Sequence, residues 1–415
     1  MKAYGKFSLL LITALFFAVE SAPAQKIKLG EKLKRKGNQR LNRKIDKTID
    51  KGFDKVEKGV DDSTKSDKKK KDKEPGDNTK SSSKNDGNPV DSTNVENPEN
   101  NQVLKAWSNY DFVPGNKIIF EDNLLNEQNG EFPSKWDLKR GSVENARFGN
   151  ENVISFVTRS STIAPLMKTE NYLPEVFTLE FDAYYYLTGN EGYYINFKGG
   201  SSIRVNYYNA YMDSFSGNVR SKNRADMKPG WRHIALSFNK RALKVYIDQD
   251  RVLNIPNVKN QLVNLSLSAL GPAGSSGTSV IKNIRLAAGG VKLYDRFLTD
   301  GKIVTHGILF DVNKATIKPE SMGVINSIVQ IMKDNPDVKF RIEGHTDSDG
   351  DDQYNLELSE RRAESVKKAF IQEGIAENRM ETKGWGESKP MDTNGTSEGK
   401  ANNRRVEFIS IGNEE

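Results

Sequence analysis

The feature that most restricts how this chain can fold is a long polar run with almost no apolar side chain. It extends from Asp61 to Ser92 and reads DDSTKSDKKKKDKEPGDNTKSSSKNDGNPVDS. Such a segment cannot bury enough apolar surface to offset the conformational entropy that folding removes. We therefore predict a disordered linker at residues 63–104, and we expect the packed cores in the part of the 415-residue chain that follows it.

Residues 1–24 have the features of a secretory signal. An apolar run, Phe7–Val19, follows Lys2 and Lys6 and precedes the small-residue sequence Ala22-Pro23-Ala24. A charged start, a short apolar centre and a small-residue cleavage site are the three parts of a signal peptide. We expect the chain to be exported and its mature form to begin at Gln25.

Residues 25–62 are predicted to form a basic segment with helical periodicity. Residues 25–100 as a whole carry 21 Lys and Arg residues against 15 Asp and Glu. Apolar residues recur every three or four positions, which places them in one narrow seam of a helix: Ile45, Ile49, Phe53, Val56 and Val60. This seam could support oligomerisation. It is short, however, and Gly52 weakens it, so a solvated or transient helix is the favoured interpretation.

The chain contains no cysteine and three histidines. We therefore expect no lipid-modified cysteine anchor, no disulfide, no thiol catalysis and no thiolate zinc site. We also expect no cofactor and no metal ion, because three histidines leave little imidazole chemistry. Nucleic acid is not an expected partner of an exported protein. The basic run Lys68–Lys71 could contact anionic outer-membrane lipid or glycans, although a run of charges is usually only solvated.

Residues 105–290 are predicted to form an all-β domain. Short apolar or alternating runs are separated by Gly, Pro, Asn and Ser turns, and two antiparallel sheets would bury the alternating faces as a sandwich. Most runs are shorter than the roughly 9–11 residues that a membrane-spanning strand needs. The predicted strands are Val153–Val157, Phe177–Leu187, Tyr193–Phe197, Ile203–Tyr208, His233–Phe238, Lys244–Ile247, Val263–Ala269 and Val280–Leu286.

One hairpin of this domain carries a family resemblance. The sequence GWRHIALSF at Gly230–Phe238, followed by KVYID at Lys244–Asp248, resembles the laminin G and concanavalin-like sandwich. The resemblance implies a jelly-roll fold, and its laminarinase-like members carry catalytic acids as E-x-D-x-x-E. Here Glu180 and Asp182 occupy the first two positions, but Tyr185 stands at the third. We therefore expect no enzyme, and we interpret Glu180 and Asp182 as solvent-facing residues.

Tyrosine is abundant in the same domain. Its side chains can stack on sugar rings, but they are also common in the cores and on the surfaces of sheets. Packing within the sheets is the favoured interpretation, and a lectin role is the alternative. The tyrosines concerned are Tyr184, Tyr185, Tyr186, Tyr193, Tyr194, Tyr207, Tyr208 and Tyr211.

Residues 300–412 are predicted to form a smaller α/β domain with the element order βαβαββ. Leu356, Ala363 and Val366 fall near one face of the second helix. The expected elements are strand Lys302–Phe310, helix Pro319–Lys333, strand Val338–Gly344, helix Leu356–Glu373, strand Met380–Gly384 and strand Arg405–Ile411.

This order places an acid, Asp347, on the loop after a strand, and a guanidinium, Arg362, on the helix behind it. A ligand with both an ammonium and a carboxylate would fit such a pair, because Arg binds carboxylates through a planar fork and Asp accepts from ammonium groups. From residue types alone, an ordinary salt bridge between Asp347 and Arg362 is the simpler interpretation. The acidic loop Asp347–Asp352 does not match an EF-hand, which needs a glycine at its sixth position and a glutamate at its twelfth.

Four motifs follow one another in this domain. They are Phe310-Asp311-x-Asn313-Lys314-x-x-Ile317; Gly344-His345-Thr346-Asp347 with Asn355-x-x-Leu358-Ser359-x-x-Arg362-Ala363-x-x-Val366; Gly384-x-Gly386-Glu387-x-x-Pro390; and Asn402-Asn403-Arg404-Arg405-Val406-Glu407. Together they resemble the C-terminal peptidoglycan-binding domain of the OmpA family, which Pal and MotB share. Four motifs in one order are far more specific than any one of them.

The resemblance implies that Asp347 and Arg362 hold the side-chain end of meso-diaminopimelate in the stem peptide of peptidoglycan. It adds five residues beside the ligand or in the loops that shape the site: Thr346, Asn355, Arg405, Phe310 and Asp311. We thus expect a non-covalent peptidoglycan-binding protein of the periplasm or outer membrane, which anchors or organises the Gram-negative envelope. The alternative is a carbohydrate-binding or carbohydrate-active surface protein, in which the sandwich is the functional module and residues 300–412 are its anchor.

Overall fold

The computed structural model describes residues 104, 107, 110–187, 191–207, 209–212, 228–271, 277–290 and 293–412. The predicted signal peptide (1–24), the basic segment (25–62) and, apart from Leu104, the linker (63–104) lie outside these residues. The described residues belong to one compact unit, Ser92–Glu415. In the described part of the chain, none of the helices has the length and apolar character needed to cross a membrane.

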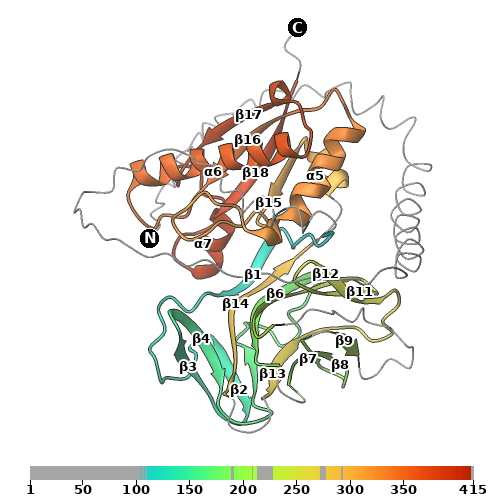
Figure 1. Ribbon diagram of the computed structural model, residues 1–415, viewed down its shortest axis with the longest axis vertical. Coiled ribbons are helices and arrows are strands. Elements are labelled where there is room, and N and C mark those ends of the chain that lie inside the picture. Colours follow the sequence, from blue (N-terminus) through green and yellow to red (C-terminus); the bar gives the residue numbers. More distant parts are fainter. Residues whose placement is uncertain are drawn as a thin grey trace, which may run out of the picture. The chain divides into compact units, whose positions relative to one another are not determined.

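The first part of the described chain consists of β-strands. They are β1 (Lys117–Asp122), β2 (Trp136–Arg140), β3 (Val143–Phe148), β4 (Glu151–Phe156), β5 (Thr162–Pro165), β6 (Val176–Tyr185), β7 (Gly192–Phe197), β8 (Ser202–Val205), β9 (Ala210–Met212), β10 (Gly230–Asn239), β11 (Ala242–Ile247), β12 (Asp250–Ile255), β13 (Leu265–Leu270) and β14 (Ser279–Ala288). One sheet has the order β12-β11-β10-β6-β14-β4-β3, with β1 also paired to β14 (Figure 1). The other has the order β2-β5-β13-β7-β8-β9.

The two sheets bury their alternating residues in one shared core. In β6, for example, Phe177, Leu179 and Phe181 are each at most 1% exposed and belong to this core. The predicted β-rich region with two antiparallel sheets is confirmed, and each predicted strand overlaps an observed one. The unpredicted strands include β2 and β3, whose sequences WDLKR and VENARF carry charged residues at exposed positions. They form strands because they pair with β5 and β4, which their own sequences do not reveal.

The second part is an α/β domain. Its elements are α4 (Leu293–Asp300), β15 (Lys302–Thr305), the 3-10 helix η1 (Pro319–Ser321), α5 (Met322–Asp334), β16 (Lys339–His345), α6 (Asp352–Gln372), η2 (Glu377–Arg379), β17 (Met380–Gly384), α7 (Ser397–Asn403) and β18 (Arg405–Ile411). The sheet order is β15-β18-β16-β17, and β16 and β17 run parallel. The predicted order is confirmed, with α7 added before the last strand. The first strand ends at Thr305 instead of Phe310, which makes an isolated bridge with Ile317.

The backbone of helix α6 lies in close contact with the backbones of β16 and β17. A Cβ atom at Gly344 would lie 2.2 Å from the Ser359 carbonyl oxygen, and one at Gly384 would lie 2.6 Å from the Glu360 amide nitrogen. Glycine is therefore required at the end of both strands. The helix begins where the Asp351 carboxylate accepts hydrogen bonds from the first-turn amides of Gln353 and Tyr354.

One prediction about this helix was wrong. Leu356 was expected on the buried face, but it is 40% exposed, whereas Leu358, Ala363 and Val366 are buried. The reason is the loop after β17, where a Cβ atom at Gly386 would lie 2.9 Å from the Leu356 amide nitrogen. Because the backbone of Leu356 contacts this loop, its side chain points away.

The sandwich and the α/β domain share a second core. Tyr110 and Phe112, which precede β1, pack with Tyr246 of β11 and with buried side chains of the α/β domain. The Asn402 side chain accepts from the Ile118 amide at 2.9 Å and donates to the Ile118 carbonyl at 3.2 Å. These contacts place β1 beside α7, so sandwich side chains can reach the loops of the α/β domain.

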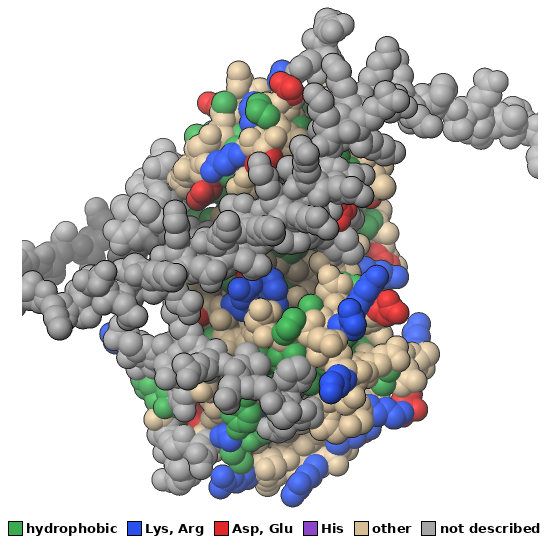
Figure 2. All heavy atoms as spheres, turned by 90° about the vertical axis from the view of Figure 1, so that its right-hand side faces the viewer, with side chains coloured by type: hydrophobic (Ala, Val, Ile, Leu, Met, Phe, Trp, Pro, Cys, Tyr) green, Lys and Arg blue, Asp and Glu red, His purple; other side chains and the backbone are tan. Residues whose placement is uncertain are grey.

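Charged side chains are visible on the uncovered part of one face of the molecule. Figure 2 shows Lys and Arg side chains scattered among hydrophobic and neutral ones in the lower half of the view.

We predict that Gly344→Ala lowers the free energy of unfolding by roughly 1–3 kcal/mol, because the added methyl group overpacks the contact between β16 and α6. Urea denaturation monitored by circular dichroism measures this. Gly412→Ala is the matched control, since a Cβ atom there meets nothing within 4 Å. Equal denaturation midpoints for the two variants would contradict the close approach of helix and strand.

Candidate ligand-binding site

Asp347 lies on the loop just beyond the carboxyl end of β16, as predicted. The amide of its neighbour Thr346 donates to the Gly386 carbonyl at 2.9 Å, which ties this loop to the loop after β17. Asp347 is 8% exposed, so its carboxylate needs a partner inside the protein or from a ligand.

The ion-pair partner of Asp347 is Arg404, not Arg362. Arg404 Nη1 donates to Asp347 Oδ2 at 2.5 Å, and the Asp349 amide donates to Asp347 Oδ1 at 3.2 Å. Burial would lower the pKa of Arg404, but Glu121 and Asp347 outweigh it and raise that pKa. Arg404 therefore carries its charge next to the candidate acid.

Arg362 lies close enough to interact electrostatically with Asp347. Its Nε donates to the Lys314 carbonyl at 3.0 Å, and its guanidinium carbon lies 5.0 Å from the ring centre of Phe310. Burial lowers the pKa of Arg362, and Asp347 is among the groups that oppose this shift. Arginine remains charged at pH 7 despite such a shift. The structure thus brings Arg362, Phe310 and Asp347 into one neighbourhood without a direct salt bridge between the acid and Arg362.

Asn355 connects the loops around Asp347. Its side-chain nitrogen donates to Glu387 Oε2 at 2.7 Å and to the Asp349 carbonyl at 3.2 Å. Asn355 is 2% exposed, and these hydrogen bonds hold the loops together. Asp311 lies in the segment between β15 and η1, in a turn where its amide donates to the Thr316 carbonyl at 3.2 Å.

Arg405 faces into the domain. It is 6% exposed, and its Nε donates to Glu407 Oε1 at 2.6 Å. Its Nη1 and Nη2 donate to the carbonyls of Asn403 and Lys389 at 3.2 and 3.1 Å. The structure therefore shows Arg405 engaged with the protein itself, while the preceding residue, Arg404, contacts Asp347.

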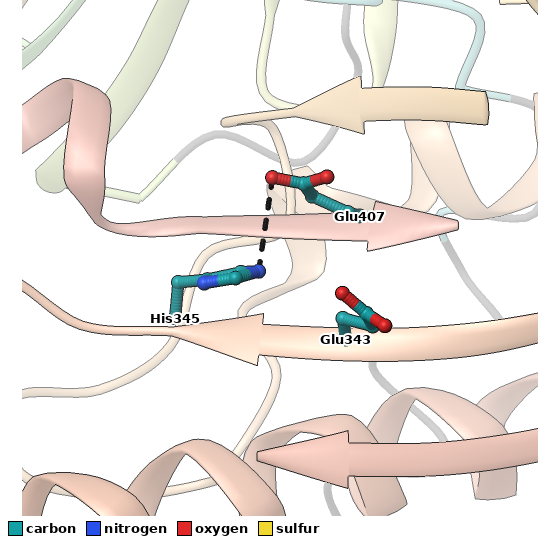
Figure 3. A group of neighbouring side chains, drawn as sticks. All are labelled: Glu343, His345 and Glu407. Carbon is teal, nitrogen blue, oxygen red and sulfur yellow. Dashed lines mark ion pairs between the residues drawn. The ribbon is translucent and has the colours of Figure 1, made fainter. Parts of the chain in front are cut away.

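Glu343, His345 and Glu407 point toward one another in the sheet (Figure 3). Candidate ligand atoms of these residues lie within 4.8 Å of one another. Glu343 accepts from Arg341 Nε at 2.7 Å and Glu407 accepts from Arg405. Because each carboxylate already balances a guanidinium, the geometry describes an ion-pair cluster around a buried histidine.

Glu180 and Asp182 of β6 face His233 of β10. His233 Nδ1 lies 2.9 Å from Asp182 Oδ1, and Nε2 lies 3.6 Å from Glu180 Oε2. Glu180 is 4% exposed, so its assignment as a solvent-facing residue was wrong. Ala235 of β10, the partner of Glu180 in the strand register, is 0% exposed and belongs to the second core with Tyr110, so this outer face of the sheet is covered.

The described tyrosines of the sandwich differ in their exposure. Tyr185 and Tyr193 are buried in the core, as expected. Tyr184 and Tyr186 are partly exposed, and Tyr184 packs against Trp231 with ring centres 5.5 Å apart. Tyr208 lies outside the described residues.

The sequence interpretation missed Arg404 and Glu121. Glu121 of β1 is buried, and its Oε2 accepts from Arg404 Nη2 at 2.5 Å. The usable signal was the pair Arg404-Arg405 in the last family motif, where Arg404 follows α7 and immediately precedes β18. No sequence pattern pointed to Glu121.

We predict that the three histidines titrate in two ranges, His306 and His345 in one and His233 in the other. Burial lowers the pKa of His306 and of His345 to about 4. Burial also opposes the charge on His233, but Asp182 and Glu180 outweigh it and raise its pKa well above the ordinary value. NMR titration, with each ring assigned by a His→Gln variant, should show His233 charged at pH 7 and the other two neutral.

The same shifts give opposite effects on stability. His306 and His345 gain protons in the unfolded chain near pH 6.5, so they lower the free energy of unfolding as the pH falls from about 6.5 to about 4. His233 contributes stability that is fully present below about pH 6.5 and is lost as the pH rises through its higher folded pKa. A His233 ring that titrates at or below its ordinary pKa would contradict the ion pairs described above.

Comparison with known proteins points to one family for the second domain. The model of the OmpA family matches residues 309–404. The chain is 42% identical over 100 residues to outer membrane porin F of Pseudomonas fluorescens, which covers 24% of this chain and 31% of that protein. It is 38% identical over 103 residues to the probable lipoprotein YiaD of Escherichia coli, covering 25% and 47% of the two chains.

Two further similarities each cover about a quarter of this chain. Outer-membrane lipoprotein YfiB of Pseudomonas aeruginosa is 41% identical over 102 residues, which covers 25% of this chain and 61% of that one. A crystal structure of the peptidoglycan-associated lipoprotein from Burkholderia pseudomallei is 26% identical, with a TM-score of 0.25 over 28% of this chain and 92% of that one. This chain thus spans between about a third and three fifths of the length of these three curated relatives. Residues 309–404 of this chain form an OmpA-family domain.

Proposed function

We propose that the OmpA-family domain binds peptidoglycan non-covalently and so anchors the protein in the envelope of a Gram-negative bacterium. The observation that carries this proposal is the grouping of Asp347 and Arg362 beside loops of the family motif. Relatives named as outer membrane proteins and lipoproteins support an envelope location, either the periplasm or the outer membrane. The proposed role is binding, without a catalytic step.

The two charges suit a ligand that bears both an ammonium and a carboxylate. The Arg362 hydrogen bond uses Nε, so a ligand carboxylate can approach the two Nη groups. Asp347 can accept an ammonium beside its contacts with Arg404 and the Asp349 amide. The side-chain end of meso-diaminopimelate carries both groups on one carbon, and we propose it as the ligand.

The remaining predicted residues have supporting roles in this proposal. Asn355 and Thr346 hold the loop of Asp347, and Phe310 lies beneath the guanidinium of Arg362. We place Asp311 and Arg405 in the loops and strand that shape the site. Each charge-assisted contact is worth about 1.5–3 kcal/mol, so one site binds weakly. Retention then comes from the many sites of a polymeric wall.

We predict that Asp347→Ala and Arg362→Ala each strongly reduce co-sedimentation of the full chain with purified sacculi, because each removes one of the two charges offered to the ligand. Arg361→Ala is the matched control, since Arg361 is the exposed neighbour of Arg362 on α6. Sacculi with lysine in place of diaminopimelate should retain the wild-type chain poorly, because lysine lacks the side-chain carboxylate. Unchanged pelleting of both site variants would overturn the proposed function.

The sandwich supports a second candidate function, carbohydrate binding. A cavity of about 450 Å³ lies over β2, β5, β7 and β13, a size typical of small-molecule sites. Its lining offers charged, amide and phenol groups that can bond sugar hydroxyls: Asp137, Lys139, Tyr172, Asn196 and Asn264. A jelly-roll or concanavalin-like sandwich with a polar cavity would suit a surface glycan-binding module anchored by the OmpA-family domain.

We predict that, if the sandwich binds glycans, Asp137→Ala and Asn196→Ala release the full chain from polysaccharides that retard it in affinity electrophoresis. Asn254→Ala, an exposed residue of β12 away from the cavity, should leave the retardation unchanged. A chain that no polysaccharide in a broad panel retards would exclude this candidate.

A further inference from the structure

Arg404 holds two carboxylates from two different parts of the chain. Its Nη1 donates to Asp347 Oδ2 and its Nη2 donates to Glu121 Oε2, each at 2.5 Å. Glu121 belongs to β1 of the sandwich, whereas Asp347 belongs to the OmpA-family domain. A guanidinium commonly grips a single carboxylate with two parallel bonds. Here the two Nη groups of one guanidinium bind two different carboxylates.

Glu121 is held in this position from several sides. Its side chain is 6% exposed, and its second oxygen accepts from Arg285 Nη2 at 2.9 Å. Its amide donates to Glu398 Oε1 at 3.3 Å, and Lys135 Nζ donates to its carbonyl at 2.6 Å. Burial by itself would raise the pKa of Glu121, but Arg285 and Arg404 outweigh it and lower that pKa. Glu121 is therefore a fixed negative charge at neutral pH.

Because Arg404 binds two carboxylates, it occupies less of the hydrogen-bonding capacity of Asp347. Arg404 gives Asp347 one hydrogen bond, to Oδ2, and the bond to Oδ1 comes from the Asp349 amide at 3.2 Å. If the charge of Glu121 were removed, Nη2 of Arg404 could turn to Asp347. The Arg404–Asp347 ion pair would then have two hydrogen bonds. The ammonium of an incoming ligand would have to compete with this stronger ion pair for Asp347.

We propose that Glu121 is a positioning residue for the ligand-binding site: by accepting the hydrogen bond of Arg404 Nη2, it leaves Asp347 able to accept the ammonium of a zwitterionic ligand. This inference rests on the proposed function of Asp347. It makes the sandwich a determinant of affinity at the OmpA-family domain through a single shared guanidinium.

The expected loss of affinity in a Glu121 variant follows from the exposure of the Arg404 side chain. The Arg404 side chain is 33% exposed, so water screens part of its interaction with both acids. We therefore expect Glu121→Gln to weaken binding about five- to tenfold, near the low end of couplings between sites. Glu121→Asp keeps the charge on a shorter side chain and should give an intermediate affinity.

The test uses the full chain and a soluble stem tetrapeptide that contains meso-diaminopimelate, with ligand-observed NMR because this method follows weak binding. Wild type, Glu121→Gln, Asp347→Asn and the double variant form a cycle. We expect Glu121→Gln to weaken binding in the wild-type background and to have no further effect when Asp347 is already Asn. Glu398→Gln is the matched control, since it perturbs the same contact with β1 without touching Arg404.

The outcomes separate this inference from the proposed function. If Asp347→Asn leaves binding unchanged, the proposed function fails, and the inference fails with it. If Asp347→Asn weakens binding but Glu121→Gln does not, the inference alone is overturned. Equal losses from Glu121→Gln in both backgrounds would show a general structural effect and would also overturn it. Thermal unfolding of each variant establishes that it is folded, and an affinity of Glu121→Asp between those of wild type and Glu121→Gln supports the charge as the cause.

Discussion

The candidate site depends on the backbone contact between α6 and the ends of two parallel strands. At Gly344 and Gly384 the helix comes so close that a Cβ atom would meet backbone atoms of Ser359 and Glu360 at 2.2 and 2.6 Å. With no side chain between helix and strands, their relative positions are set by hard-sphere contact. Arg362 on this helix and Asp347 after β16 are thereby placed by rigid elements, which a binding site needs for a defined geometry.

Charge neutralisation is the second constraint on the same region. An uncompensated buried charge costs several kcal/mol, and the domain avoids this by pairing Asp347 with Arg404 and Glu407 with Arg405. Arg362 differs, because within the described part of the chain it contacts a backbone carbonyl and the face of Phe310, both uncharged. Under the proposed function, a ligand carboxylate would supply the acid contact that Arg362 lacks among the described residues.

Much of the fold could be predicted from the sequence, because apolar periodicity and turn residues are local signals. They indicated the β-rich first part and the order of strands and helices in the second. Strands such as β2 and β3 could not be found, since charged residues interrupt their apolar pattern and pairing with neighbours makes them strands. Glu180 was misassigned for a related reason. Its exposure depends on what covers the outer face of β6, and that cover comes from distant segments.

The sequence by itself determined the four ordered motifs, and their resemblance to the OmpA family named Asp347, on a loop after a strand, and Arg362, on a helix, as site candidates before any coordinates. Only the tertiary structure decided which guanidinium meets Asp347 and that Glu121 shares it. Arg404 and Glu121 are 283 positions apart in the chain, and no local pattern relates residues at such a separation. Their contact exists because β1 packs against α7, which brings a sandwich carboxylate to the edge of the OmpA-family site. Periodicity reports the face on which a side chain lies, whereas its partner is set by the packing of whole domains.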